Sequence, residues 1–370
     1  MILVSVKRYN PLGKGGTVKS ITQFILTLIL LLSASTSFAQ QSKLETYGYF
    51  DLEAEVGNQD AESKIWTFHQ HHLNVITIYH LDDRFRVFAE MAWEHEATFE
   101  AEGEDHAKID LTRAWLEYKH SDAFKVQVGK ILVSFGIYGE KYNATPTFLS
   151  TFLPSSIYGQ HKNSVGGKDL MYPKHLTGIQ ALGSFYAKDW GIDYYLYVTN
   201  GRGPTPYEKD NNVNKGLGGR VIVNPPLRPL RLGVSYYSDK DGNSFNTKQS
   251  TLGFDVALDY SNVLVETEVL LPRGEKVDTN NTPNGKFQNK MGYYVQGAYT
   301  FFEQLTPFVR YDFWDTDVDK GNDGENILTV GINYSFTPRV YLKNEIHFHG
   351  FQDAVTKSYE MYVASLAVAF

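Results

Sequence analysis

The residues best suited to chemistry gather in one long stretch of the chain, 133–174, that has no strand pattern. It carries four lysines against two acids, whereas the whole chain has a formal net charge of −7. The lysines are Lys141, Lys162, Lys168 and Lys174, and the acids are Glu140 and Asp169. Clustered positive charge between low-dielectric walls raises the local concentration of anions. We therefore predict that this segment attracts anions.

Further basic residues occupy one face of stretches in which polar and apolar residues alternate. Those predicted to extend the basic surface are Arg113, Lys125, Lys130, Arg220, Arg231 and Arg310, and Lys119 and Lys343 share their face. For each one alone, an ion pair with an acid such as Glu117, Asp312 or Glu345 is the favoured alternative. The acids Asp51, Glu53, Glu90, Asp255 and Glu266 share that face and would compete, favouring cations.

No pattern for catalysis or metal binding stands out. The chain has no cysteine, which excludes thiolate catalysis and cysteine-ligated metals, and it has no nucleophile motif. His69 and His71 share a face, as do His347 and His349, but such histidines are more often polar wall residues than metal ligands. We predict no enzyme activity, no cofactor and no metal site.

The first 39 residues predict an export signal. Four basic residues and no acid precede an apolar run at 21–32, which ends in small residues before Ala39. The run is shorter than the roughly 20 residues of a membrane-spanning helix, so cleavage after Ala39 is favoured over an anchor. Removing 1–39 would change the net charge from −7 to −11. The acidic balance argues against a nucleic-acid partner.

The remainder, 40–370, alternates polar and apolar residues through sixteen predicted strands. Phe254, Val256 and Leu258, for example, oppose Asp255 and Asp259. A two-sheet sandwich would give the same alternation. The predicted strands are 44–56, 66–79, 85–96, 109–119, 124–132, 175–186, 190–200, 215–224, 230–237, 249–260, 263–271, 289–301, 305–313, 326–336, 339–349 and 358–370.

The connections between the predicted strands separate these two folds. Short turns alternate strictly with long loops, and tyrosine, phenylalanine and tryptophan gather beside the short turns. This arrangement is typical of an up-and-down antiparallel β-barrel that crosses an outer membrane. The long third loop, 133–174, contains Phe148, Phe152 and Ile157, so we expect it to fold into the pore and narrow it.

The last predicted strand resembles the C-terminal insertion signal of Gram-negative outer-membrane barrels. It ends on Phe370, with Tyr362, Leu366 and Val368 on the same face.

A second resemblance is to the phosphate-selective porin family (porins O and P). The segment 111–119, the strand 124–130 with its Val-Gly-Lys, and Ser134-Phe135-Gly136 are similar to that family, although Ser134 stands where the family usually has proline. The resemblance implies a sixteen-stranded trimeric porin with a loop in the pore.

We thus predict a porin in the outer membrane of a Gram-negative bacterium. It would pass small hydrophilic solutes or ions by passive diffusion, with a weak preference for anions such as phosphate. Expected partners are outer-membrane lipid and lipopolysaccharide, the barrel-assembly machinery and two further copies in a homotrimer. The alternatives are a cation-preferring or general porin, a barrel enzyme, an adhesin with a plugged lumen and a soluble exported β-protein.

Overall fold

The computed structural model describes residues 43–60, 62–70, 72–94, 108–141, 144–162, 168–201, 212–227, 229–240, 245–353 and 355–370. The chain divides into two units, Met1–Glu45 and Thr46–Phe370. The predicted export signal lies outside the described residues. No helix in the described part is long and apolar enough to cross a membrane.

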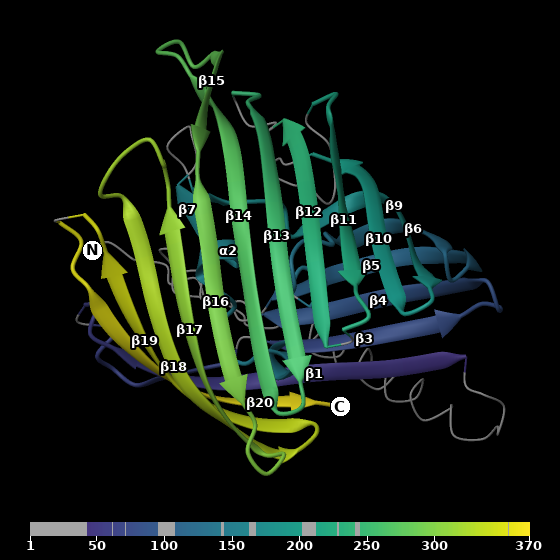
Figure 1. Cartoon of the computed structure of the whole chain (residues 1–370), viewed down its shortest axis with the longest axis horizontal. Helices are drawn as coiled ribbons and strands as arrows, with labels where there is room; N and C mark the ends of the chain where they lie inside the picture. Colours follow the sequence, from purple (N-terminus) through teal and green to yellow (C-terminus); the bar gives the residue numbers. More distant parts are fainter. Residues whose placement is uncertain are drawn as a thin grey trace, which may run out of the picture. The chain divides into compact units, whose positions relative to one another are not determined.

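The second unit is a closed antiparallel β-barrel (Figure 1). Eighteen strands pair in one sheet, and two of its crossings are each built from two consecutive strands, β2 with β3 and β15 with β16, which leaves sixteen crossings. The strands of the first half are β1 (Leu44–Gly57), β2 (Thr67–His69), β3 (Leu73–His80), β4 (Phe85–Glu94), β5 (Lys108–Ser121), β6 (Phe124–Leu132), β9 (His175–Ala187), β10 (Trp190–Asn200) and β11 (Lys215–Asn224). Those of the second half are β12 (Leu230–Lys240), β13 (Lys248–Tyr260), β14 (Val263–Val277), β15 (Pro283–Asn289), β16 (Met291–Tyr299), β17 (Leu305–Asp315), β18 (Gly324–Thr337), β19 (Val340–Phe351) and β20 (Tyr359–Ala369).

The sheet closes where the last strand pairs with the first. In the β1–β20 ladder Phe50 lies opposite Val368 and Leu52 lies opposite Leu366. Gly48 and Phe370 exchange backbone hydrogen bonds of 2.9 and 2.8 Å. Closure removes the open edges that an isolated sheet would present, which is a condition for strands in a lipid bilayer. The predicted barrel of sixteen crossings is confirmed.

Alternation separates the two faces of the wall. On β14, Val263 and Val265 are exposed on the outer face, whereas Glu266 and Glu268 are buried on the inner face. Aromatic side chains on the outer face cluster near the short turns, as the sequence predicts for an aromatic belt at a membrane interface. The exposed members are Phe124, Phe185, Trp190, Tyr260, Phe301, Tyr334 and Phe336.

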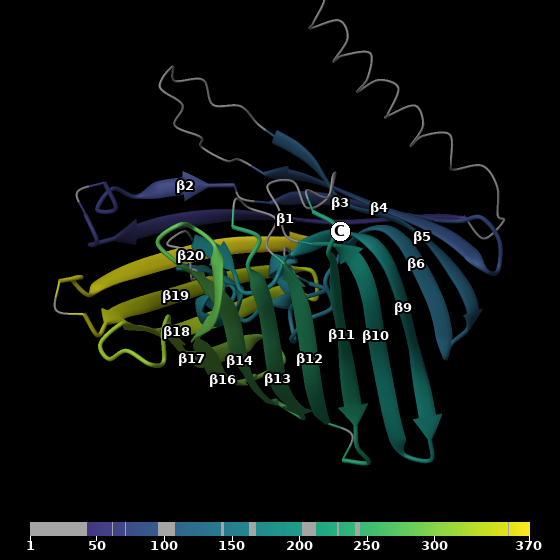
Figure 2. The same ribbon diagram turned by 90° about the horizontal axis from the view of Figure 1, so that it is seen from above.

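The third long connection, 133–174, lies inside the barrel (Figures 1 and 2). We call it the inner segment. It contains the 3-10 helix η1 (Thr145–Thr147), the short helix α2 (Ser155–Tyr158) and a hairpin of β7 (Gln160–Lys162) and β8 (Lys168–Leu170). Its apolar side chains supply most of the buried core, which includes Phe135, Tyr158 and Tyr172. The core of this molecule is therefore the contact between the inner segment and the wall.

Candidate functional site

The inner segment leaves the wall at β6 and then packs against the opposite half of the barrel. Its first anchor is on β12, where the Gly136 backbone N–H donates to the Ser235 hydroxyl at 3.2 Å. The φ angle of Gly136 is +65°, and a side chain there would meet the Glu268 carboxylate. Only glycine combines that backbone conformation with so close an approach, which explains the residue at this bend.

Two buried glutamates on β14 hold the inner segment through tyrosines. The Tyr158 hydroxyl donates to Glu268 at 2.8 Å, and the Tyr138 hydroxyl donates to Glu266. Tyr294 of β16 also donates to Glu268, at 2.8 Å. Burial, followed by the charge of the nearby carboxylates, holds the pKa of the Tyr138 and Tyr158 hydroxyls well above the ordinary value. Both hydroxyls therefore stay protonated and remain donors at physiological pH.

A buried lysine on β19 donates hydrogen bonds to backbone carbonyl groups of the inner segment. Lys343 is 1% exposed, and its Nζ donates to the carbonyls of Thr145 and Phe148 at 2.7 Å each and to that of Ser150 at 3.3 Å. Beside it on β18, the Asn333 amide donates to the Leu149 carbonyl at 2.7 Å. Three donors on one ammonium group match this cluster of three carbonyls, of which that of Thr145 also accepts from the Phe148 backbone N–H at 3.3 Å.

Charged residues on β17 and β19 hold the next turn of the segment. Arg310 donates to the Phe152 carbonyl at 2.8 Å and to its own neighbour Asp312 at 2.7 Å. Glu345 accepts from the Thr151 backbone N–H at 2.9 Å. Arg310, Lys343 and Glu345 on β17 and β19 are thus covered by the inner segment, and these charges hold that segment in place.

On the other half of the wall, two arginines keep part of their side chains exposed to the lumen. On β4 and β5, Arg86 makes a bidentate pair with Glu117 at 2.7 and 3.0 Å, and Arg113 pairs with Glu90. In each pair the base is more exposed than the acid: 36% against 2% for Arg86 and Glu117, and 19% against 2% for Arg113 and Glu90.

The predicted basic residues separate into three groups. Lys125 is half-buried, opposite Lys119 in the β5–β6 ladder, and Arg231 is exposed opposite the buried Ala257; both belong to the open half. Lys141 is exposed on the inner segment, and Lys174 lies at its end, where its carbonyl accepts from the Val133 backbone N–H. The backbones of Lys162 and Lys168 pair in the β7–β8 hairpin, and their side chains lie outside the described residues.

The structure differs from the prediction for three residues. Arg220 is 5% exposed and pairs with Asp255 at 2.8 Å, and Arg310 is 3% exposed beneath the inner segment. Neither presents its charge to the open lumen, because an acid neighbour and the packed segment cover it. Lys130 has the outward parity of Val128, and its amino group donates to the Leu111 carbonyl.

Neither Arg86 nor the tyrosine anchors are identifiable as site residues from the sequence. Arg86 shares the face of Glu90 by alternation, so the pattern placed it on the inner wall, and only its exposure marks it as part of the open half. Tyr138 and Tyr158 look like ordinary apolar packing residues in the sequence. Their role depends on contacts more than 100 residues distant, which no local pattern carries.

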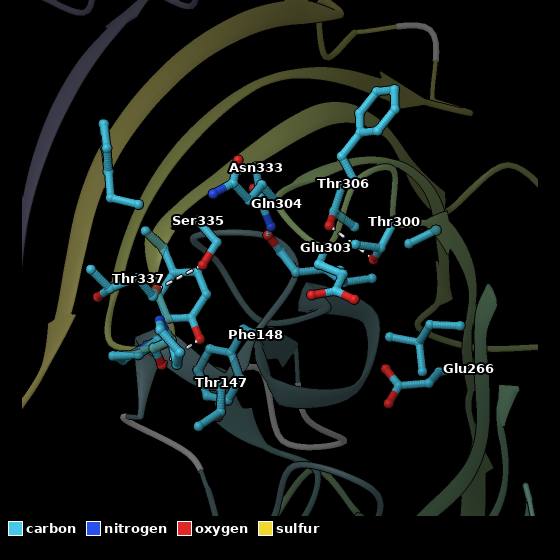
Figure 3. A pocket seen from close by; sticks show the side chains of 18 of the residues that line it. Thr147, Phe148, Glu266, Thr300, Glu303, Gln304, Thr306, Asn333, Ser335 and Thr337 are labelled. Atoms are coloured by element: carbon cyan, nitrogen blue, oxygen red, sulfur yellow. Dashed lines mark hydrogen bonds between the residues drawn. The ribbon is translucent and has the colours of Figure 1, made fainter. Parts of the chain in front are cut away.

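A cavity of about 620 Å³ lies beneath the inner segment, toward two of the short turns (Figure 3). Thr147 and Phe148 of the inner segment border it on one side, and Glu303 and Gln304 of a turn border it on another. Among the described residues, no group of three or more histidines, aspartates or glutamates is placed to hold a metal ion.

Comparison with known proteins agrees with this architecture. The sequence matches the Gram-negative porin family over residues 26–353, so the chain belongs to that family. Its fold is similar to that of OmpF of Salmonella typhi in complex with daunomycin, with a TM-score of 0.61 and 11% identity over 90% of this chain and 99% of the other. It is similar to outer-membrane expressed OmpT of Vibrio cholerae, with a TM-score of 0.60 and 12% identity over 88% and 97% of the two chains. It is also similar to the outer-membrane channel DcaP of Acinetobacter baumannii, with a TM-score of 0.57 and 11% identity over 88% and 97%.

The search of curated protein sequences found no match. The family and the fold together place the chain in the outer membrane of a Gram-negative bacterium, as a channel-forming barrel. They identify a channel as the class of this protein. The match is to the Gram-negative porin family in general and does not identify the phosphate-selective porins.

Proposed function

We propose that the protein is a diffusion channel for small hydrophilic solutes with a weak preference for anions, phosphate among them. The observation that carries the proposal is the exposure of the ion pairs on the open half of the wall. Arg86 and Arg113 face the lumen, whereas their partners Glu117 and Glu90 are buried behind them. Arg231 and Lys125 add positive charge on the same half.

The geometry of each ion pair decides whether the electrostatic potential at the lumen surface attracts anions or cations. An ion in the lumen lies nearer to the exposed guanidinium than to the buried carboxylate, so the attraction of an anion exceeds its repulsion. Low-dielectric walls reduce screening and strengthen the difference. Glu140 and Lys141 are both exposed on the inner segment and largely offset each other. The preference is therefore expected to be weak.

The zero-current potential across a planar bilayer tests the proposal. In a tenfold KCl gradient the wild-type channel is expected to give the sign of chloride preference. Replacing Lys125 and Arg231 together by glutamine should move the potential toward zero, because neither residue belongs to the buried pairs. Arg339→Gln, on an exposed short turn, is the matched control and should leave the potential unchanged. A wild-type potential of the cation-preferring sign would refute anion preference and favour the cation-preferring alternative.

We also propose the remaining features expected from the sequence. They are cleavage of residues 1–39 as an export signal, insertion by the barrel-assembly machinery through Tyr362, Leu366, Val368 and Phe370, contact with lipopolysaccharide, and a homotrimer. A Vibrio cholerae OmpT structure with a TM-score of 0.58 is described as a trimer form, which supports the last proposal. Mass spectrometry of the protein purified from outer membranes tests cleavage and stoichiometry together; an uncleaved N-terminus or a monomeric mass would contradict them.

A further inference from the structure

The cavity beneath the inner segment differs in chemistry from the open half of the wall. Its volume of about 620 Å³ falls in the range of small-molecule sites. Glu266 and Glu303 line it, and no lysine, arginine or histidine is found among its described lining residues. Lys141 and Arg231 act electrostatically on Glu266 from outside the cavity. Glu303, whose side chain points into the cavity in Figure 3, therefore sets the charge of the site.

The hydroxyl groups around the cavity already donate their protons elsewhere. Each bond to a backbone carbonyl uses the single hydrogen of a hydroxyl and leaves its oxygen free to accept. These bonds are Thr147 to Ala144 at 2.7 Å, Ser335 to Thr337 at 2.7 Å and Tyr341 to Pro338 at 2.8 Å. Thr300 and Thr306 share a further bond of 3.0 Å, so one of their two hydrogens is also used. Gln304 keeps the donor hydrogens of its amide, since its carbonyl oxygen accepts from the Tyr334 hydroxyl at 3.5 Å. The hydroxyl groups around the cavity thus present mainly acceptors.

Asn333 adds an acceptor that has no partner. Its amide nitrogen donates to the Leu149 carbonyl at 2.7 Å, which fixes the orientation of the amide because an oxygen there would be repelled. The Oδ1 atom is buried without a hydrogen-bond partner, in a side chain that is 8% exposed and lines the cavity. Leaving a buried carbonyl oxygen unpaired costs about 1–3 kcal/mol. The Oδ1 atom is covered by its neighbours, so a ligand's donor would reach it after a small shift of the surrounding side chains, and relief of this cost would favour that shift.

Aromatic surface completes the site. Phe148 of the inner segment, which is 6% exposed, and Phe302 of the short turn, which is 87% exposed and stands at the mouth of the cavity, both border it. Phe302 and Glu303 are consecutive non-glycine residues with φ angles of +53° and +61°, a conformation that costs energy and places both side chains at the cavity. Rings of this kind pack against apolar groups and attract cations through their faces.

We propose that this cavity binds a small organic cation that carries one ammonium group on an apolar ring. An ammonium group has three donors and no acceptor, which complements carboxylates, hydroxyl oxygens and the Asn333 carbonyl oxygen together. A neutral alcohol would satisfy fewer acceptors, and a carboxylate would be repelled by Glu303. The site does not depend on the ion preference of the channel, and the nearest residue of the basic half is Arg231, two strands away from Glu266 in the same row of the sheet.

Three small molecules that each carry a phenyl ring and differ only in their polar group test which ligand charge the cavity prefers. Calorimetry of the detergent-purified protein with 2-phenylethylamine, 2-phenylethanol and phenylacetate should show saturable binding of the amine alone. Binding should weaken as salt increases, because the attraction is electrostatic. Comparable binding of the alcohol would overturn the role of the ammonium group, and absence of amine binding would overturn the site.

Two variants locate the binding. Glu303→Gln should weaken amine binding about fivefold, and Ala298→Leu, which fills the cavity without changing its charge, should abolish it. Asp189→Asn is the matched control, because Asp189 is an exposed acid in another short turn and does not line the cavity. Conductance of both variants should match the wild type, which shows that they fold. Unchanged amine binding in both would place the amine elsewhere and contradict the proposal.

Discussion

At the scale of single residues, the charged groups inside this barrel have two different roles. Lys343, Arg310 and Glu345 hold the inner segment by bonding its backbone. Arg86 and Arg113 keep part of their surface in the lumen, each over a buried acid. Burial distinguishes the two groups, since residue type and strand parity are the same. A charge that is covered by packed chain contributes to structure, whereas an exposed one contributes to the field in the channel.

The tyrosine anchors predict how stability depends on pH. The folded-state pKa of Tyr138 is raised by burial and by Glu266, so the folded protein keeps the proton when the unfolded chain begins to lose it near its ordinary value of 10.0. Unfolding then becomes easier as the pH rises above about 10. Tyr138→Phe should lower the urea midpoint at pH 8, and its difference from the wild type should narrow between pH 9 and pH 11.

A second substitution separates this effect from general alkaline damage. Tyr186 is 76% exposed, so Tyr186→Phe should show a constant difference from the wild type across the same pH range. If the Tyr138→Phe difference also stayed constant with pH, the buried hydroxyl would not be the group that titrates.

At the scale of elements, the strands follow directly from the sequence, because a period of two and a short turn are local signals. The predicted strand 66–79 is interrupted in the structure into β2 and β3, and β14 and β15 extend beyond the predicted 263–271 and 289–301. The path of the inner segment, in contrast to the strands, does not follow from local sequence signals. Its length and rings predicted that it would enter the lumen, but its anchors on Glu266, Glu268 and Lys343 are long-range contacts that no local pattern encodes.

The same limit applies to the candidate site. Arg113 and Arg220 both have inward parity and an acid partner, and only the assembled barrel shows that the first is partly exposed and the second covered. The lining of the cavity near Glu303 comes from the inner segment, β14, β16, β17, β18, β19 and two turns, so no local sequence pattern predicts its chemistry.

The bend at the start of the inner segment predicts an asymmetry between two glycines. Gly136 and Gly285 both have positive φ, at +65° and +73°, but a Cβ on Gly285 would meet no atom within 4 Å. Gly285→Ala should therefore cost only the backbone strain, about 1 kcal/mol. Gly136→Ala should cost clearly more, because its Cβ would collide with the Glu268 carboxylate and the Tyr158 hydroxyl.

Two readouts measure the effect of these glycine substitutions. The urea midpoint reports the loss of stability, and single-channel current noise reports movement of the inner segment. Gly136→Ala should increase both the loss and the noise, and Gly285→Ala should leave the noise unchanged. Equal behaviour of the two variants would show that the bend does not fix the inner segment.

At the scale of the whole molecule, the barrel is divided lengthwise. Strands β12–β19 anchor the inner segment. The open lumen is bordered by β4 and β5 and by the ends of β6, β9 and β12 beside the short turns, where Lys125, Ser184 and Arg231 are at least partly exposed. A barrel of sixteen strands is wide enough for an aqueous channel, and the inner segment narrows that channel from one side. Small hydrophilic solutes would therefore pass along the basic half of the wall.

Labelling of single introduced cysteines tests this division most directly, because the natural chain contains no cysteine. Ser184 on the open half is partly exposed, and Ser365 on the inner face of β20 is 1% exposed. A charged, membrane-impermeant thiol reagent, applied to channels in a planar bilayer, should react rapidly with Ser184→Cys and change its current, and should react far more slowly with Ser365→Cys. Equal rates, or a faster reaction of Ser365→Cys, would contradict the account that the passage runs along the basic half.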